Sequence, residues 1–143
     1  MTTARDTWRT EHSIETTATP EAIWGLFRDV PGWTAWNAGI ERVELDGPFA
    51  EGTWFTMKPP GQDAFVSTLV EVRENERFVD ETRVGDLVVK VAHRIERLDA
   101  RRVRVTYAID AKGPGAAEIG PAIAADFPDV LRALTSCAEA NAS

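Results

Sequence analysis

Two long alternating runs and a helix breaker occupy residues 87–115, which read LVVKVAHRIERLDARRVRVTYAIDAKGPG. Apolar side chains recur at every second position in both runs, which is the period of a strand with one buried face. Only Asp99-Ala100-Arg101 separates the runs, and so short a connection joins antiparallel strands. We therefore predict a hairpin of two long strands, Leu87–Leu98 and Arg102–Lys112, which Gly113-Pro114-Gly115 ends.

The chain before this hairpin is predicted to add five strands, at Thr7–Thr16, Ile40–Leu45, Thr53–Lys58, Ala64–Arg73 and Arg77–Val84. Short turn sequences rich in Gly, Pro and Asp separate the later strands, which favours an antiparallel meander. The length of the last two strands requires the sheet to twist and curl. The orientation of Ala64–Arg73 stays open, because Phe65 and Leu69 compete with Val70 and Val72 for the buried face.

Helices are predicted at both ends of the meander. Thr19 is a good N-cap before Pro20, and the helix that begins there ends at Val30-Pro31, with a second short turn at Trp33–Ala38. The region Ala116–Ala140 forms a long amphipathic helix, and Pro128 predicts a kink at which Asp126 caps the second half. Its expected apolar stripe consists of Ile119, Ile123, Phe127, Val130, Leu134 and either Cys137 or Ala138.

These elements predict an α+β fold in which a seven-stranded curved antiparallel sheet wraps around one long C-terminal helix. The whole chain, residues 1–143, is expected to form a single domain, since its length is typical of one. A single helix cannot fill the concave side of so wide a sheet. We therefore expect a hollow between sheet and helix, and apolar hollows of this kind bind small molecules.

Charge and composition exclude several classes of partner. The net charge of -7 argues against nucleic acid and anionic membrane surfaces, which bind clustered Lys and Arg. No apolar run approaches the length of a membrane span, so we expect no integral membrane association. The single cysteine, Cys137, fits a reducing cytoplasm, and we interpret it as a small core residue. The oligomeric state is left open.

Strand parity places four polar side chains in the hollow, namely His12, Asp80, His93 and Tyr107. His93 shares the parity of Val89, Val91 and Ile95, and the other three follow apolar neighbours in the same way. Each is either a buried polar group satisfied by a neighbour or a functional group. In the functional interpretation His93 and Tyr107 act as acid and base or as hydrogen-bonding anchors, with Asp80 as a further candidate.

The five tryptophans divide between core and cavity. We assign Trp24 and Trp36 to the core, and Trp33 and Trp54 to the cavity mouth, where an apolar ring with one polar handle suits a half-wet site. Asp126 is expected to cap the second half of the helix, and the alternative is that it joins the polar groups of the hollow. The expected ligand-binding set is His12, Trp33, Trp54, Asp80, Val91, His93, Tyr107, Ile123 and Phe127.

Several stretches are similar to one known family: Ser13-Ile14-Glu15, Thr19 to Trp24, Asp29 to Trp36, Gly52-Thr53, Val91 to Ile95, Arg102 to Tyr107 and Gly113-Pro114. They resemble the bacterial polyketide cyclase/dehydrase and lipid-transport branch of the START-like (SRPBCC) superfamily over nearly the whole chain. The resemblance implies the Bet v 1-like helix-grip fold. Members of the superfamily include lipid carriers, hormone binders, polyketide cyclases and oxygenase domains, so the fold alone selects no function.

No metal or cofactor is expected. The chain has only two histidines, and no carboxylate at a suitable spacing completes an iron triad with them. A phosphate-binding glycine loop and a paired-cysteine motif are also missing from the sequence. The leading hypothesis is a protein that binds a small, largely hydrophobic molecule, because this role requires only the cavity. The alternative is an enzyme of the polyketide cyclase/dehydratase type that uses cavity polar groups for acid/base catalysis, and a protein-interaction module ranks last.

Overall fold

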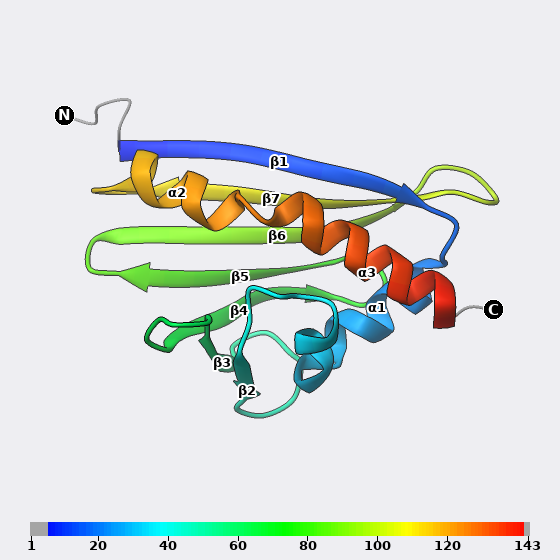
Figure 1. Ribbon diagram of the computed structural model, residues 1–143, viewed down its shortest axis with the longest axis horizontal. Coiled ribbons are helices and arrows are strands. Elements are labelled where there is room, and N and C mark those ends of the chain that lie inside the picture. The colour runs from blue at the N-terminus through cyan, green and yellow to red at the C-terminus, as the bar shows by residue number, and fades with distance from the viewer. Residues whose placement is uncertain (1–5, 142–143) are drawn as a thin grey trace.

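The computed structural model describes residues 6–141 and contains one seven-stranded antiparallel sheet in the order β1-β7-β6-β5-β4-β3-β2 (Figure 1). The strands are β1 (Thr7–Thr16), β2 (Arg42–Leu45), β3 (Trp54–Lys58), β4 (Phe65–Arg73), β5 (Arg77–Val84), β6 (Leu87–Arg97) and β7 (Val103–Lys112). The helices are α1 (Pro20–Arg28), the 3-10 helix η2 (Val30–Ala35), α2 (Ala116–Ala124) and α3 (Phe127–Asn141). The predicted helix-grip architecture is confirmed.

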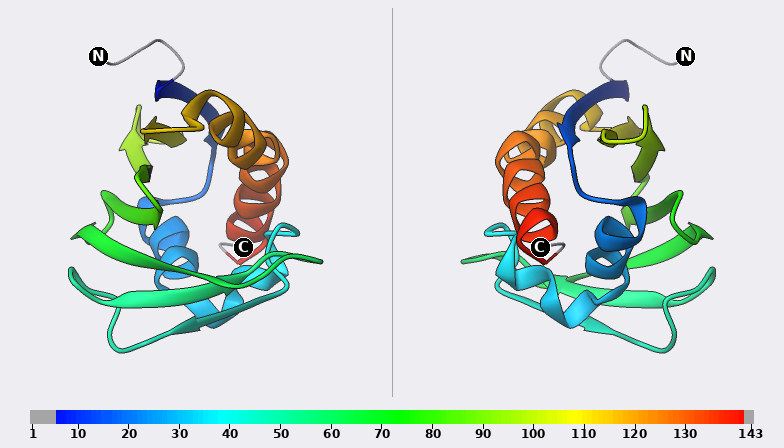
Figure 2. Two further views of the ribbon diagram at one scale, coloured as in Figure 1. Left: turned by 90° about the vertical axis from the view of Figure 1, so that its left-hand side faces the viewer. Right: turned by 90° about the vertical axis from the view of Figure 1, so that its right-hand side faces the viewer.

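The sheet curls around the C-terminal helices (Figure 2). Strands β1, β7, β6 and β5 are successive neighbours in the sheet and pair in register over almost their full length. Strands this long accumulate the right-handed twist that bends a sheet into a trough. Helices α2 and α3 lie along the concave side of this trough, whereas α1 and η2 lie at one end of it (Figures 1 and 2).

A β-bulge in β4 explains why the orientation of this strand could not be predicted. Leu69 pairs with Asp80, but the next paired residue, Glu71, lies opposite Val79, so one residue is inserted between them. Leu69 is fully buried before the bulge and Val72 packs against the core after it, while Val70 is 40% exposed. Both competing parities are therefore correct, each for one half of the strand.

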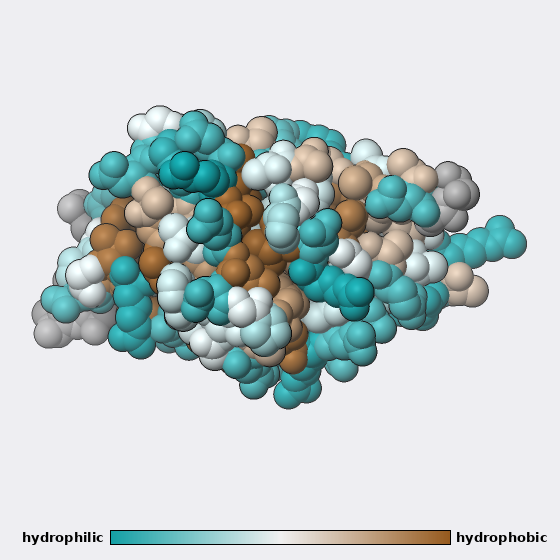
Figure 3. All heavy atoms as spheres, turned by 90° about the horizontal axis from the view of Figure 1, so that it is seen from below, coloured by the Kyte–Doolittle hydropathy of each residue, from teal (hydrophilic) through white to brown (hydrophobic). Residues whose placement is uncertain are grey.

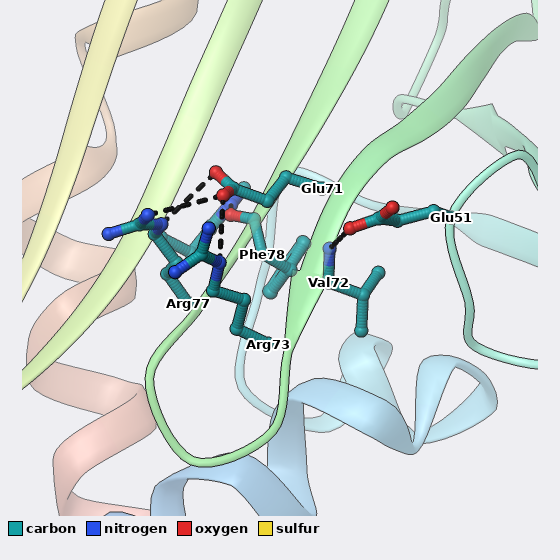
Figure 4. Close-up of polar contacts among 7 residues, drawn as sticks. Glu51, Glu71, Val72, Arg73, Arg77 and Phe78 are labelled. Carbon is teal, nitrogen blue, oxygen red and sulfur yellow. Dashed lines mark hydrogen bonds and ion pairs between the residues drawn. The ribbon is translucent and has the colours of Figure 1, made fainter.

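Polar contacts surround the bulge (Figure 4). Glu71 accepts two hydrogen bonds from the guanidinium of Arg77 and forms an ion pair with Arg73. The backbone N–H of Val72 donates to the carboxylate of Glu51 at 3.1 Å. The backbone N–H of a residue beside the bulge is thus satisfied by a side chain from the loop before β3.

The N-terminus of α1 is capped as predicted. The hydroxyl of Thr19 accepts a hydrogen bond from the N–H of Ala22 at 3.1 Å, and Pro20 occupies the first helical position. The second short helix begins at Val30 and not at Trp33 as predicted. Its start is earlier because Pro31 occupies a first-turn position, where a proline opens a helical turn as readily as it ends one.

The C-terminal helix is divided as predicted, but its first half turns a different face to the sheet. The buried residues of α2 are Ala116, Gly120 and Ala124. A Cβ atom on Gly120 would lie 2.4 Å from the ring of Trp8, so only glycine lets α2 approach β1 this closely. Ile119 and Ile123 were predicted to lie on the buried stripe with α3, yet they are 37% and 36% exposed and face the hollow.

Asp126 also departs from its predicted role. It lies between α2 and α3, but within residues 6–141 no N–H of α3 donates a hydrogen bond to its carboxylate. Its oxygen instead approaches the loop after η2, where a Cβ on Gly39 would lie 2.6 Å from it. No helix in the described part of the chain is both long and apolar enough to cross a membrane.

Candidate ligand-binding site

A pocket of about 650 Å³ lies between the concave face of the sheet and the C-terminal helices. Its size is that of sites for drug-sized molecules. Strands β3 to β7 form its floor and walls, α2 and the start of α3 form its roof, and η2 closes one side. The lining residues used below are Trp33, Trp36, Gly39, Phe55, Ser67, Phe78, Asp80, Thr82, Val84, Val91, His93, Tyr107, Glu118, Ile119, Ile123, Asp126 and Phe127.

The rim of the pocket is partly apolar. The pocket lining includes Ile119 and Ile123 of α2 and Val84 at the end of β5, although these residues are 36% to 56% exposed. Seen from below, apolar residues gather in the centre and at the left of the molecular face, among polar ones (Figure 3). Exposed isoleucine and valine side chains at a pocket rim suit contact with a hydrophobic ligand.

The sheet register brings the polar side chains of the pocket together in neighbouring rows. Phe78 of β5 pairs with His93 of β6, which pairs with Tyr107 of β7. In the next row toward the opposite end of β5, Asp80 pairs with Val91. A further pair, Ser67 and Thr82, joins hydroxyl groups at 2.6 Å.

His93 is held between aromatic rings. Its imidazole stacks on Phe78 with ring centroids 3.9 Å apart, and Tyr107 meets it edge-on at 4.6 Å. Burial among these rings lowers the pKa of His93 to about 3, although a hydrogen bond to the carbonyl of Phe78 opposes the shift. Histidine is therefore neutral here at every physiological pH.

The tautomer of His93 follows from its hydrogen bond. Nδ1 lies 3.2 Å from the carbonyl oxygen of Phe78, and since a carbonyl only accepts, Nδ1 carries the proton. Nε2 of the neutral ring is then an acceptor, and it faces Oδ2 of Asp80 at 3.9 Å. This separation is too long for a direct hydrogen bond.

Asp80 is the most strongly perturbed carboxyl group of the pocket. Burial raises the pKa of Asp80 to about 7, because no cation compensates for the loss of water. Burial also raises the pKa of Tyr107, and the negative charges of Asp80 and Asp126 add to the shift. The pKa of Asp126 is raised by burial as well. Asp80, Asp126 and Tyr107 therefore keep their protons to higher pH than usual, beside a neutral histidine.

Most of the sequence-predicted residues line the pocket: Trp33, Asp80, Val91, His93, Tyr107, Ile123 and Phe127. Trp33, however, does not lie at a half-wet mouth. It is 5% exposed, and its indole N–H donates to the carbonyl of Phe27 at 2.8 Å. Its polar handle is thus engaged inside the protein and is not available to water.

Two predicted residues lie elsewhere. Trp54 is 44% exposed and absent from the pocket lining, and its neighbour Phe55 faces the pocket with 1% exposure. The prediction for Trp54 is wrong because both parities of β3 carry an aromatic residue, and pairing of Phe55 with the inward Ser67 selects the other one. His12 lies on the inner face of β1, but its ring packs edge-on against Phe127 at 6.4 Å and does not line the pocket.

Several lining residues were left out of the expected ligand-binding set, among them Trp36, Ser67 and Thr82. Trp36 was assigned to the core; it is 6% exposed and contacts the pocket, and its indole N–H has no partner among the residues that the structure describes. Ser67 was missed because the orientation of its strand was undecided. Thr82 lines the pocket beside Ser67, and their hydroxyl groups hydrogen-bond to each other.

The raised pKa of Asp80 predicts how the unfolding free energy of the protein changes with pH. The folded-state pKa of about 7 exceeds the ordinary value of 3.8, so the unfolded chain releases this proton first as pH rises. Asp80 therefore destabilises the fold progressively between pH 4 and pH 7. Relative to the wild type, Asp80→Asn is expected to gain on the order of 3 kcal/mol of unfolding free energy between pH 4.5 and pH 8.

Urea denaturation of both proteins across this range measures the difference. His93 acts in the opposite direction, because its lowered pKa destabilises the fold as pH falls below 6.5, but it is present in both proteins and largely cancels. Asp86→Asn, in the exposed turn between β5 and β6, controls for the removal of a carboxylate as such. A stability difference between wild type and Asp80→Asn that did not change with pH would contradict the assignment.

The trough-shaped sheet that holds a long C-terminal helix over a pocket defines the helix-grip class of α+β proteins. Residues 7–139 match the family model described as polyketide cyclase/dehydrase and lipid transport. The chain belongs to this family. A comparison with curated protein sequences finds no match.

Solved structures with the same fold share little sequence with the chain. The Zhui aromatase/cyclase from a Streptomyces species is 15% identical with a TM-score of 0.82, and the alignment covers 96% of both chains. Norcoclaurine synthase from Thalictrum flavum is 14% identical with a TM-score of 0.76, over 96% of this chain and 97% of that one. A START superfamily protein from Mycobacterium smegmatis is 16% identical with a TM-score of 0.72, over 92% and 97%.

Proposed function

We propose that the protein binds a small, largely hydrophobic molecule in the pocket between the sheet and the C-terminal helices. The observation that carries the proposal is the pocket itself, about 650 Å³ in size and walled by aromatic and aliphatic side chains with a few convergent polar groups. This combination is typical of small-molecule sites. Membership of a family described by polyketide cyclisation and lipid transport supports the same role.

Native mass spectrometry of freshly purified protein tests this proposal. We expect a fraction of the protein to carry an added mass of one small molecule, which mild activation or organic solvent releases. Protein whose pocket is blocked by Val91→Trp should carry no such mass when prepared in the same way, since Val91 lines the pocket. An adduct of equal abundance on both proteins would show that the molecule is bound elsewhere.

A second candidate function is acid/base catalysis of the polyketide cyclase type. Asp80 favours it, because a carboxyl group with a pKa of about 7 gives and takes protons efficiently at neutral pH. Of the candidate groups, Asp80 suits proton transfer better than His93, since an imidazole with a pKa of about 3 is a weak base. His93 and Tyr107 then orient the substrate or its carbonyl groups by hydrogen bonding.

Two variants separate catalysis from binding. In a cyclase, Asp80→Asn should lower the rate of aldol cyclisation of an arylated 1,3,5-triketone by about 100-fold, because an amide cannot transfer the proton. His93→Gln, which keeps a donor and an acceptor, should lower it by less than about 10-fold. Absorbance of the triketone gives the rate. A wild-type rate no faster than buffer would exclude cyclisation of this substrate class and leave the binding role as the proposed function.

A further inference from the structure

The charges of the pocket lining are all of one sign. Asp80, Glu118 and Asp126 line the pocket, whereas none of its described lining residues is Lys or Arg. His93 does not supply a positive charge either, because its imidazole is buried against Phe78 and remains neutral. The site therefore contains no group that would neutralise a carboxylate, sulfate or phosphate on a ligand.

Cations near the pocket are already paired outside it. Lys90 and Arg83 both reach Glu81, which follows Asp80 on the opposite face of β5. Lys58, at the end of β3, donates to Glu41 at 2.6 Å. Alternation along the strands thus places the positive charges on the outer surface and leaves Asp80 without one.

Polar groups in the pocket lack partners. Tyr107 is 4% exposed and lines the pocket, and within residues 6–141 its hydroxyl makes no hydrogen bond. The carboxyl of Asp80 likewise has no hydrogen-bond partner in this part of the chain, since Nε2 of His93 remains 3.9 Å away. Both side chains line the pocket, so a bound ligand can hydrogen-bond to their oxygens without displacing a protein partner.

We propose, building on the binding role above, that the pocket selects a hydrophobic amine, whose ammonium group binds Asp80. A ligand ammonium supplies hydrogen-bond donors to the carboxylate and removes the penalty of an unpaired buried charge. The apolar body of the ligand packs against Trp33, Phe55 and Phe127, and aromatic faces add cation–π attraction near the charge. An anionic ligand of the same shape meets only negative charge.

Three indoles that differ mainly in charge test this preference: tryptamine, tryptophol and indole-3-acetate. Each carries a short side chain at position 3, which ends in an amine, an alcohol or a carboxylate. Isothermal titration at pH 8, where the amine is protonated and Asp80 is mostly ionised, should give about 10-fold tighter binding of tryptamine than of tryptophol. Indole-3-acetate should bind at least about 10-fold more weakly than tryptophol, because the lining offers it no cation. Asp80→Asn should reduce the preference for tryptamine over tryptophol to less than about 3-fold.

Glu81→Gln is the matched control, because it removes a carboxylate from the adjacent position of the same strand but on the outer face. This variant should keep the full preference for the amine. The inference is overturned if indole-3-acetate binds as tightly as tryptophol, or if the amine preference survives in Asp80→Asn. It is also overturned if none of the three probes binds while the neutral dye N-phenyl-1-naphthylamine does, a result that leaves the binding role intact. Failure of all four compounds contradicts both proposals.

Discussion

Replacing Val91 by Trp is expected to abolish binding of a neutral hydrophobic dye such as N-phenyl-1-naphthylamine. Val91 is 8% exposed, lines the pocket, and pairs across the sheet with Asp80, so an indole at this position fills the space that the dye needs. We expect the affinity to fall about 100-fold or more, which corresponds to about 3 kcal/mol of binding free energy. Fluorescence titration of wild type and variant measures the loss.

Val88→Trp is the control for this experiment. Val88 precedes Val91 on β6 by three residues, so the two side chains point to opposite faces of the sheet, and Val88 is absent from the pocket lining. An added indole there should leave dye binding within about 2-fold of the wild type, because the pocket is unchanged. Equal losses in both variants would mean that the dye reports general disturbance of the sheet and not occupancy of the pocket.

Replacing Leu134 by Asp should unfold the protein. Leu134 is fully buried on the face of α3 that lies against the sheet and α1. Truncation of such a side chain costs about 2–5 kcal/mol, and an unpaired buried carboxylate adds several more. The sum is comparable with the total stability of about 5–15 kcal/mol that a domain of this size has. The variant is expected to lose its cooperative thermal transition by circular dichroism.

Ser136→Asp provides the comparison, since Ser136 is exposed on the same helix two positions later. Its melting temperature should remain within a few degrees of the wild type, because surface substitutions usually change stability by about 0.5 kcal/mol or less. If Leu134→Asp melted as cooperatively as Ser136→Asp, α3 would not be the cover that the trough requires. Folding would then depend on the sheet and α1 alone.

The part of the site that was predicted best lies on the long strands, where inward and outward side chains alternate regularly along the sequence. Val91 and His93 share one parity in β6, and Tyr107 has the matching parity in β7, so their common face required no knowledge of three-dimensional contacts. Strand period is a property of the backbone, and it holds wherever the strand is regular. The same logic placed Asp80 on the inner face of β5.

Irregular or two-sided segments could not be predicted in this way. The bulge after Leu69 reverses the parity of β4, and Trp54 and Phe55 offer β3 a large ring on either face, so tertiary pairing makes the choice. The rotation of α2 depends on one close contact, that of Gly120 with Trp8. The spacing of Ile119 and Ile123 in the sequence does not reveal whether these residues line a cavity or pack into a solid core.

The protonation states of His93 and Asp80 could not be predicted from the sequence either. A carboxylate beside a histidine generally opposes the lowering of its pKa. In the structure Asp80 lies alongside, yet burial raises its own pKa to about 7, and the pKa of His93 falls to about 3. Which of two neighbouring groups keeps its charge depends on desolvation, and desolvation depends on packing that a sequence does not reveal.

Methyl NMR during titration with N-phenyl-1-naphthylamine tests the central claim, occupancy of the pocket by one small hydrophobic molecule, most directly. The account predicts saturation at one equivalent, with the largest shifts at the pocket methyl groups of Val91, Ile123 and Val130. The methyl groups of Val70 and Val88, which are absent from the pocket lining, should hardly move. Shifts concentrated at Val70 and Val88, or no saturable shift at Val91, would contradict the claim that this pocket is the binding site.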